Sequence, residues 1–313
     1  MTDFDIIIYH NPCADGTGAL WCTKQNQEQI EDILFIPCIA GKTNDIDVKL
    51  FNNKRVLFVD ICPSYNMLSM MYDAKIITIL DHHKTTFEMY RENFDDNNVD
   101  KFVSIHDNII FNIDMGRAGC QLSWDYFYPG TKRPWFIDYI ADRDLWHWNM
   151  PNSKAINTAM YEKNLLTIEG MNEMNTYDQE QIDALCDYGM IKLAPFNMEV
   201  DNICDMAMEA TTFINNTTYR VWLVLCSPKY KSEVGNKLSL RLFDDDVKPD
   251  FAVMWRPNPC PGSNELYVSL RNTKGIDLSI VAKYYDTDGG GHEQASGFTL
   301  YDVDNIEDIF CPV

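Results

Sequence analysis

Residues 75–84 read Lys75-Ile-Ile-Thr-Ile-Leu80-Asp81-His82-His83-Lys84 and are the best guide to the architecture. An apolar run of strand length ends here in a carboxylate and two imidazoles, which predicts a buried strand with a polar carboxyl end. Similar runs precede it, separated by helical patterns. The predicted strands are Phe4–Tyr9, Ile33–Cys38, Arg55–Val59 and Lys75–Leu80, and the predicted helices are Thr17–Gln25, Ser64–Tyr72 and Thr85–Tyr90. This alternation indicates βαβ units and a largely parallel sheet flanked by helices.

Ionisable residues follow these strands at the edge where open α/β sheets bind their ligands. They lie in His10-Asn-Pro-Cys-Ala-Asp15-Gly16, at Asp60, in Asp81-His82-His83 and in Ala141-Asp142-Arg143-Asp144. Carboxylate oxygens suit Mg²⁺ and Mn²⁺, and added imidazole moves the preference toward Mn²⁺ and later metals. Each segment alone also fits a strand cap, a turn, a helix N-cap or a salt bridge. Four such segments at one sheet edge favour a divalent metal pair.

The second half of the chain changes character twice. Helical patterns at Gly119–Tyr128 and Trp135–Tyr139 lead into a helical stretch from Asn152 to Met208, which Pro195 is expected to break. A β-rich region follows, with strands at Tyr219–Cys226, Phe251–Trp255, Leu266–Arg271 and Gly297–Tyr301 and a helix at Leu278–Tyr285. We therefore predict an N-terminal α/β domain over residues 1–150, a helical connector over 151–214 and a smaller C-terminal α/β domain over 215–313.

A glycine run near the C-terminus, Gly289-Gly290-Gly291-His292, follows the last predicted helix. Glycines let the backbone approach a ligand closely, and consecutive N–H groups can surround an anion. Arg271 ends a strand upstream and offers a bidentate fork for phosphate. Taken alone, the run also fits a flexible turn beside a surface arginine.

Composition narrows the classes of protein and partner. The 313 residues carry a formal net charge of −21 and no basic cluster, whereas proteins that bind long nucleic acids need a basic surface. No apolar run is long enough to predict a membrane span, and the acidic start is unlike a signal peptide. The ten cysteines include no C-x-x-C pair, which favours reduced thiols. We expect a cytoplasmic protein with a small phosphate-containing substrate and no membrane partner, and homo-oligomerisation stays open.

These motifs resemble those of the DHH phosphoesterase superfamily, which includes RecJ-type exonucleases, nanoRNA and cyclic-dinucleotide hydrolases and exopolyphosphatases. Asp81-His82-His83 resembles the motif that names the family, and Asp15, Asp60 and Asp142 match its other metal-binding motifs. Residues 269–271 and 289–298 resemble the DHH-associated C-terminal domain. The segments 9–16 and 139–146 look most like an exopolyphosphatase-like or oligoribonuclease-like subgroup. Cys13 is a departure, because many relatives have an aspartate there.

The resemblance implies a metal-dependent phosphohydrolase, most simply a phosphodiesterase, with two Mn²⁺ ions, or Mg²⁺ or Co²⁺ in their place. It implies Asp60 as the bridging ligand, with His10, Asp15, His82 and Asp142 completing the metal sites. Asp81 would orient a histidine ligand and His83 would contact phosphate or leaving group, while the roles of Cys13 and Asp144 stay open. The implied substrate-binding residues are Arg271, Gly289, Gly290, Gly291 and His292.

Three functions fit this resemblance. The first is hydrolysis of a short phosphodiester such as nanoRNA, a dinucleotide or a related small nucleotide, and the second is a polyphosphatase or pyrophosphatase. The third is an inactive domain that binds nucleotide. Aromatic residues that could stack on a base, or simply fill the core, are Trp146, Trp148, Phe298 and Tyr301.

Overall fold

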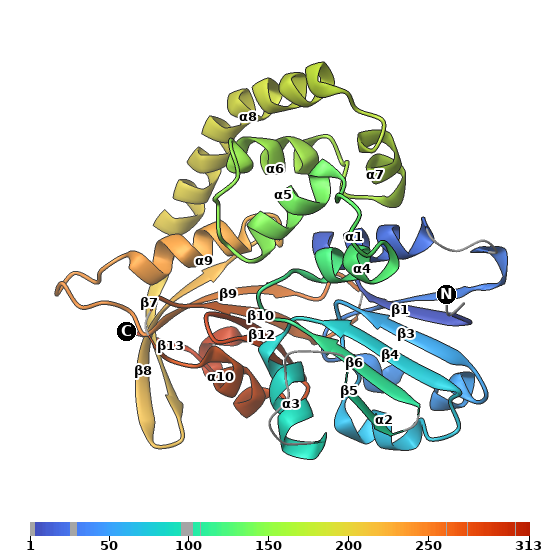
Figure 1. Cartoon of the computed structure of the whole chain (residues 1–313). Coiled ribbons are helices and arrows are strands. Elements are labelled where there is room, and N and C mark those ends of the chain that lie inside the picture. Colours follow the sequence, from blue (N-terminus) through green and yellow to red (C-terminus); the bar gives the residue numbers. More distant parts are fainter. Residues whose placement is uncertain are drawn as a thin grey trace. The chain divides into compact units, whose positions relative to one another are not determined.

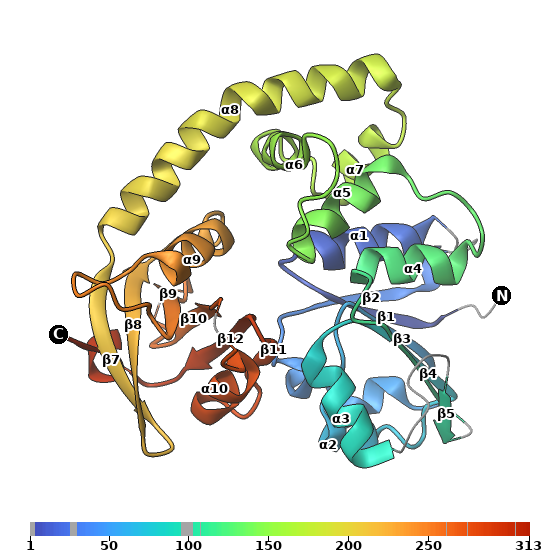
Figure 2. The ribbon, with the colours of Figure 1, turned by 60° about the vertical axis from the view of Figure 1, so that its left-hand side comes forward.

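The computed structural model describes residues 4–25, 30–94, 103–106, 108–260, 262–273, 275–303 and 305–313. The chain forms two compact units, an N-terminal unit, Met1–Ala194, and a C-terminal unit, Pro195–Val313. Each unit has its own sheet with helices on both faces (Figures 1 and 2). The predicted α/β fold class is therefore confirmed.

The N-terminal unit is built on a six-stranded sheet in the order β2-β1-β3-β4-β6-β5. The first five strands in this order are parallel, and β5 runs antiparallel to β6 at the edge. The strands are β1 (Ile6–His10), β2 (Leu34–Cys38), β3 (Arg55–Val59), β4 (Ile76–Asp81), β5 (Val103–His106) and β6 (Ile109–Ile113). The chain leaves β1 for β2 on one side and returns to β3 on the other. In parallel sheets, ligands bind at such a reversal of strand order.

Alternate side chains of the central strands enter two separate cores, as the twofold period of a strand requires. Ile7 and Leu57 pack under α1, α4 and α5, whereas Ile8 and Phe58 pack on the face covered by α2 and α3. Figure 2 shows α1 and α4 on one side of the sheet and α2 and α3 on the other. The helices are α1 (Ala14–Lys24), α2 (Tyr65–Met70), α3 (Lys84–Phe94), α4 (Gly119–Phe127) and α5 (Trp135–Asp144).

Three further helices complete the N-terminal unit and lead out of it: α6 (Ser153–Glu162), α7 (Ile168–Met174) and α8 (Gln179–Asp205). The break predicted at Pro195 is wrong, because α8 continues through this residue. A proline removes the hydrogen bond to the carbonyl four residues earlier. That carbonyl belongs to Ile191, which is 72% exposed, so water can replace the missing donor. None of the helices in the described parts of the chain is long and apolar enough to cross a membrane.

The C-terminal unit is built on a seven-stranded sheet in the order β11-β12-β10-β9-β8-β7-β13, in which only β8 and β9 pair in parallel. The strands are β7 (Met208–Ile214), β8 (Thr217–Leu225), β9 (Phe251–Pro257), β10 (Leu266–Arg271), β11 (Gly290–His292), β12 (Ala295–Leu300) and β13 (Cys311–Pro312). Helix α9 (Lys231–Leu240) covers one face and α10 (Leu278–Tyr285) covers the other. Short 3₁₀ turns occupy Ile30–Asp32, Thr43–Asp45, Val48–Phe51 and Ile306–Asp308.

Candidate metal centre

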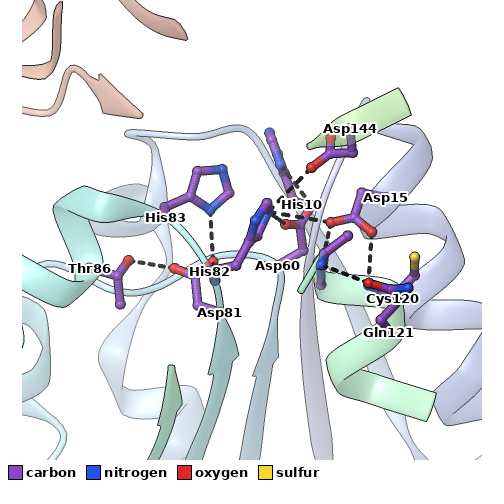
Figure 3. A network of polar contacts seen from close by, with 12 residues as sticks. His10, Asp15, Asp60, Asp81, His82, His83, Thr86, Cys120, Gln121 and Asp144 are labelled. Atoms are coloured by element: carbon purple, nitrogen blue, oxygen red, sulfur yellow. Dashed lines mark hydrogen bonds and ion pairs between the residues drawn. The ribbon is translucent and has the colours of Figure 1, made fainter. Parts of the chain in front are cut away.

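The carboxyl ends of β1, β3 and β4 bring together residues that are far apart in the sequence. His10 ends β1, Asp60 follows β3, and Asp81 ends β4 immediately before His82 and His83. Figure 3 shows these side chains gathered above the strand ends, at the reversal of strand order between β1 and β3. The convergence expected from the sequence is therefore present.

Asp60 lies at the middle of this group and is 1% exposed. One carboxylate oxygen, Oδ2, is 3.2 Å from Nδ1 of His10, and the other, Oδ1, is 3.1 Å from Nε2 of His82. Burial opposes ionisation of Asp60, but the hydrogen bonds and charges of the two histidines outweigh it and hold its pKa well below the ordinary value. Asp60 therefore points one charged oxygen toward each histidine.

His82 is surrounded by carboxylates from three elements. Its Nε2 lies 3.1 Å from Asp60 Oδ1, 3.4 Å from Asp15 Oδ2 and 3.6 Å from Asp144 Oδ2. Burial opposes a charge on His82, but the hydrogen bond to Asp60 and the charges of Asp144, Asp60 and Asp15 raise its pKa well above the usual value. The converging carboxylates therefore favour the protonated form of this imidazole.

Asp15 is held by the N-terminus of α4. Its Oδ2 accepts a hydrogen bond from the backbone N of Gly119 at 2.6 Å, and its Oδ1 accepts one from Cys120 N at 2.8 Å. These donors belong to the first turn of a helix, where N–H groups lack partners within the helix and favour a negative charge. A Cβ on Gly119 would meet Asp60 Cβ at 2.6 Å and Asp15 Oδ2 at 3.0 Å, so only glycine fits this contact.

Asp81 orients His83. Its Oδ1 accepts from His83 Nδ1 at 2.7 Å and from the backbone N of His82 at 2.9 Å, and its Oδ2 accepts from the Thr86 hydroxyl. Burial works against the charge on Asp81, yet His83 lowers its pKa below the ordinary value. A carboxylate that fixes the ring of a neighbouring histidine is a common feature of metal and phosphate sites.

Asp142 and Asp144 differ in their surroundings. Asp142 Oδ1 accepts from Asn149 N at 2.9 Å and its Oδ2 accepts from Met150 N at 3.2 Å, so this carboxylate stabilises the loop after α5. Asp144 joins Asp15 and His82 in a group whose potential ligand atoms lie within 4.8 Å of one another. Among the described residues, Asp142 belongs to no such group. The geometry therefore favours Asp144 as the ligand where the sequence pointed to Asp142.

Cys13 lies just before α1, and its backbone carbonyl accepts from the hydroxyl of Thr17 at 2.7 Å. Burial raises the pKa of its thiol well above the ordinary value, and the negative charges of Asp60, Asp144 and Asp15 raise it further. The thiolate, not the thiol, binds metals. In the part of the chain that the structure describes, Cys13 is also outside the groups of clustered ligand atoms.

The residues of this centre fit divalent cations. Among the described residues of the N-terminal unit, two groups have ligand atoms within 4.8 Å of one another: Asp15, His82 and Asp144, and His10, Asp60 and His83. Burial, with Asp60 and Asp144 close by, raises the pKa of Asp15 well above the ordinary value. That crowding of buried carboxylates is relieved by a bound cation, and carboxylate with imidazole is a ligand set that Mn²⁺ accepts.

In the C-terminal unit, Arg271 and His292 lie on one face of the sheet. Arg271 of β10 pairs with Ala295 of β12, which in turn pairs with His292 of β11. Residues directly opposite each other in antiparallel strands project from the same face. Gly290 and Gly297 pair two residues further along, with Ser269 of β10 opposite Gly297, so this face lacks a side chain only at the two glycines.

The glycine run is only partly a turn. Gly290–His292 forms β11, and Gly289 N donates to Asp286 O at 2.8 Å, which closes the turn after α10. Gly291 has φ 136°, and a Cβ there would meet Ala295 O at 2.5 Å. Gly290 and Gly291 pair with Gly297 and Ser296 of β12, so the need for glycine at Gly291 follows from the close approach of that strand.

Metal binding is expected to strengthen as the pH rises and to release protons. His82 has a raised pKa, so below that pKa a cation must displace its proton. Binding of this proton also stabilises the folded, metal-free protein. The stabilisation is complete below the pKa of the unfolded state, about 6.5, and it is lost as the pH rises through the raised pKa of His82 in the folded state. Calorimetric titration with Mn²⁺ in buffers of different ionisation enthalpy would count the protons. A pH-independent affinity from about pH 6 to about pH 9 would contradict this expectation.

Comparison with known proteins supports the fold. No family model matches the chain. Uncharacterized protein R106 of Acanthamoeba polyphaga mimivirus is 28% identical in an alignment that covers 95% of this chain and 67% of that protein. A solved structure described as "Member of s1p family of ribosomal proteins PF0399 DHH domain" has a TM-score of 0.53 at 14% identity, covering 95% of this chain and 82% of that one.

Two other solved structures are more distant. RecJ in complex with Mn²⁺ from Thermus thermophilus has a TM-score of 0.44 at 13% identity, covering 94% of this chain and 49% of that one. The pGpG-specific phosphodiesterase PggH from Vibrio cholerae has a TM-score of 0.38 at 10% identity, covering 98% of this chain and 94% of that one.

Proposed function

We propose that the chain, whose fold is similar to that of a solved DHH-domain structure, is a metal-dependent phosphohydrolase of the DHH type that cleaves a short phosphodiester. The observation that carries the proposal is the convergence of Asp15, Asp60 and Asp144 on the buried ring of His82. Carboxylates from three separate elements crowd one position at the ligand-binding edge of a parallel sheet. Such crowding costs stability without a cation, so it is more readily explained by function than by folding.

Two divalent ions, when bound, would lower the pKa of a water molecule and neutralise charge on the phosphate. We assign Asp15, His82 and Asp144 to one ion and His10 and Asp60 to the other. Asp60 is the candidate bridging ligand, since each of its oxygens already contacts a histidine of a different group. Mn²⁺ is the expected ion, with Mg²⁺ or Co²⁺ as alternatives.

His83 is the candidate for contact with the substrate phosphate. Its Nδ1 donates to Asp81, which makes Nε2 the basic nitrogen of the ring. The side chain is 22% exposed, in contrast to the buried His82. A ring fixed by a carboxylate and partly open to solvent can accept or donate a proton at Nε2 while Asp81 holds its orientation.

Arg271 and His292 are proposed to bind a second phosphate or a ribose of the substrate. Replacing Arg271 by alanine should raise KM more than it lowers kcat, because binding to a remote phosphate is lost equally from the ground and transition states. Arg256→Ala is a matched control, since Arg256 lies on the adjacent strand β9 and packs over the Tyr267 ring. A large loss of kcat at unchanged KM would instead assign Arg271 to the reacting phosphorus.

The proposed substrate is short because of charge. At a net charge of −21 the protein repels a long polyanion. The test measures kcat/KM with Mn²⁺ for four substrates: a dinucleotide, an oligonucleotide of about 20 residues, polyphosphate and pyrophosphate. The assay is run at physiological salt, where the electrostatic screening length is about 8 Å. The dinucleotide should have the highest kcat/KM. Equal kcat/KM for the long oligomer would contradict short-substrate specificity, preference for polyphosphate would favour a polyphosphatase, and binding without turnover would favour an inactive domain.

A further inference from the structure

The loop after α5 holds two tryptophans in a backbone conformation that large side chains rarely adopt. Trp146 has φ 58° and Trp148 has φ 54°. Every other non-glycine residue with positive φ in the described parts of the chain is asparagine or aspartate, which tolerate the left-handed region. Strain of this kind persists only where the surrounding structure imposes it, and it is concentrated at functional sites.

Asp142 imposes this conformation. Its backbone O accepts from His147 N at 2.9 Å and from Trp148 N at 3.3 Å, while its carboxylate accepts from the two following backbone N–H groups, of Asn149 and Met150. Asp142 is 6% exposed at the end of α5, so these bonds are anchored in a packed helix. One residue thus holds the loop in its strained form.

The two indole rings do not fill the core. Both are half-buried, and they meet edge to face with centroids 5.1 Å apart at an interplanar angle of 75°. Neither belongs to the two buried clusters that pack against the N-terminal sheet. Within the described structure, Nε1 of Trp148 is buried without a hydrogen-bond partner, which adds a further cost. Lys154 Nζ lies 5.4 Å from the centroid of the Trp148 ring, so Trp148 has a contact outside the core. Packing in the buried clusters does not explain why the strained loop carries two tryptophans.

The loop is attached directly to the metal centre. Trp146 follows Asp144 by two residues, and Asp144 Oδ2 is 3.6 Å from Nε2 of His82. Two residues of chain span at most about 7 Å, so the Cα of Trp146 lies within about 7 Å of the Cα of Asp144, a candidate metal ligand. Other aromatic candidates are less suitable: Phe298 is 6% exposed and stacks on Tyr285 within the core of the C-terminal unit.

We propose that the ring of Trp146, supported edge to face by Trp148, forms a platform on which a nucleobase of the substrate stacks, and that Asp142 is the positioning residue that holds this platform. The inference rests on the proposed phosphohydrolase function and names its substrate class: a nucleotide with a base next to the scissile phosphate, not an inorganic polyphosphate. Aromatic rings bind bases of any sequence through stacking, whereas polyphosphate has no ring to stack.

The test compares a diadenylate dinucleotide with the same phosphodiester lacking its bases. Trp146→Ala should lower kcat/KM for the dinucleotide about 10- to 100-fold, the range expected for one lost base stack, and leave kcat/KM for the abasic compound nearly unchanged. Trp146→Tyr keeps a ring and should restore most of the activity. His147→Ala is the matched control, because His147 is exposed and stands between the two tryptophans in the sequence.

Asp142→Ala should produce the same base-selective loss of kcat/KM while Mn²⁺ affinity stays at the wild-type value. Asp142→Asn should restore part of the lost kcat/KM.

An equal loss of kcat/KM on both compounds in Trp146→Ala, or no loss on either, would overturn the platform. If the wild-type protein cleaves neither compound, the phosphohydrolase function fails, and equilibrium binding then tests the platform separately. Wild-type protein should bind diadenylate more tightly than the Trp146→Ala variant does. Equal affinities of the two proteins would overturn the platform.

Discussion

Asp60→Asn is expected to abolish turnover while the protein stays folded. Asp60 has φ 57°, and asparagine tolerates this left-handed conformation, so the backbone is preserved while the charge is lost. Loss of a residue that only supports a metal ligand typically lowers activity 10- to 100-fold, so loss of the shared ligand should lower kcat by more than about 100-fold. The measurement is kcat with saturating Mn²⁺, together with circular dichroism.

Asp246→Asn is the matched control for this substitution. Asp246 has φ 61° and lies in the C-terminal unit, so the same change is made in the same backbone conformation but in the unit that does not contain Asp60. The control should keep wild-type kcat. An Asp60→Asn protein that also kept it would show that the centre is misassigned.

Gly119→Ala is expected to disable the same centre through sterics alone. The new Cβ would meet Asp60 Cβ at 2.6 Å, Asp60 Oδ1 at 2.9 Å and Asp15 Oδ2 at 3.0 Å. Neither carboxylate can move far, because both are buried and Asp15 is bound to the N-terminus of α4. A displacement of about 1 Å at a reacting centre can cost about 100-fold in rate, and a comparable loss of kcat is expected here.

Gly116→Ala separates this effect from a general effect on the loop before α4. A Cβ on Gly116 would meet only Asp114 Oδ1, at 3.2 Å, and that flexible side chain can give way. Gly116→Ala should retain both Mn²⁺ affinity and kcat. Wild-type Mn²⁺ affinity in Gly119→Ala would contradict the role assigned to the glycine.

Much of the fold follows from local sequence patterns. The bounds predicted for β3, β10 and α10 agree with the structure, because each combines a clear apolar period with polar residues at its ends. Strand β7 was missed because its mixed sequence, Met208–Ile214, follows a long helical pattern without a glycine or proline between them. Helix α9 was missed as well, since its polar sequence has only a weak apolar period.

The clustering of the candidate ligands was predictable in kind but not in detail. Polar residues at strand ends identified Asp60 and the histidines, because parallel strands end at one edge of the sheet. The choice between Asp142 and Asp144 depends on how α5 ends, which the alternation of Asp and Arg does not specify. Gly119 was missed because a close approach between α4 and Asp60 is a tertiary contact. The only local clue is the small-residue sequence before that helix.

The most direct test of the account is the metal dependence of hydrolysis. Purified protein would be stripped with EDTA, and its kcat on a dinucleotide measured before and after Mn²⁺ is restored. The account predicts no turnover in excess EDTA and recovery on adding Mn²⁺, with Asp60→Asn inactive in both states. Full turnover in excess EDTA would contradict it.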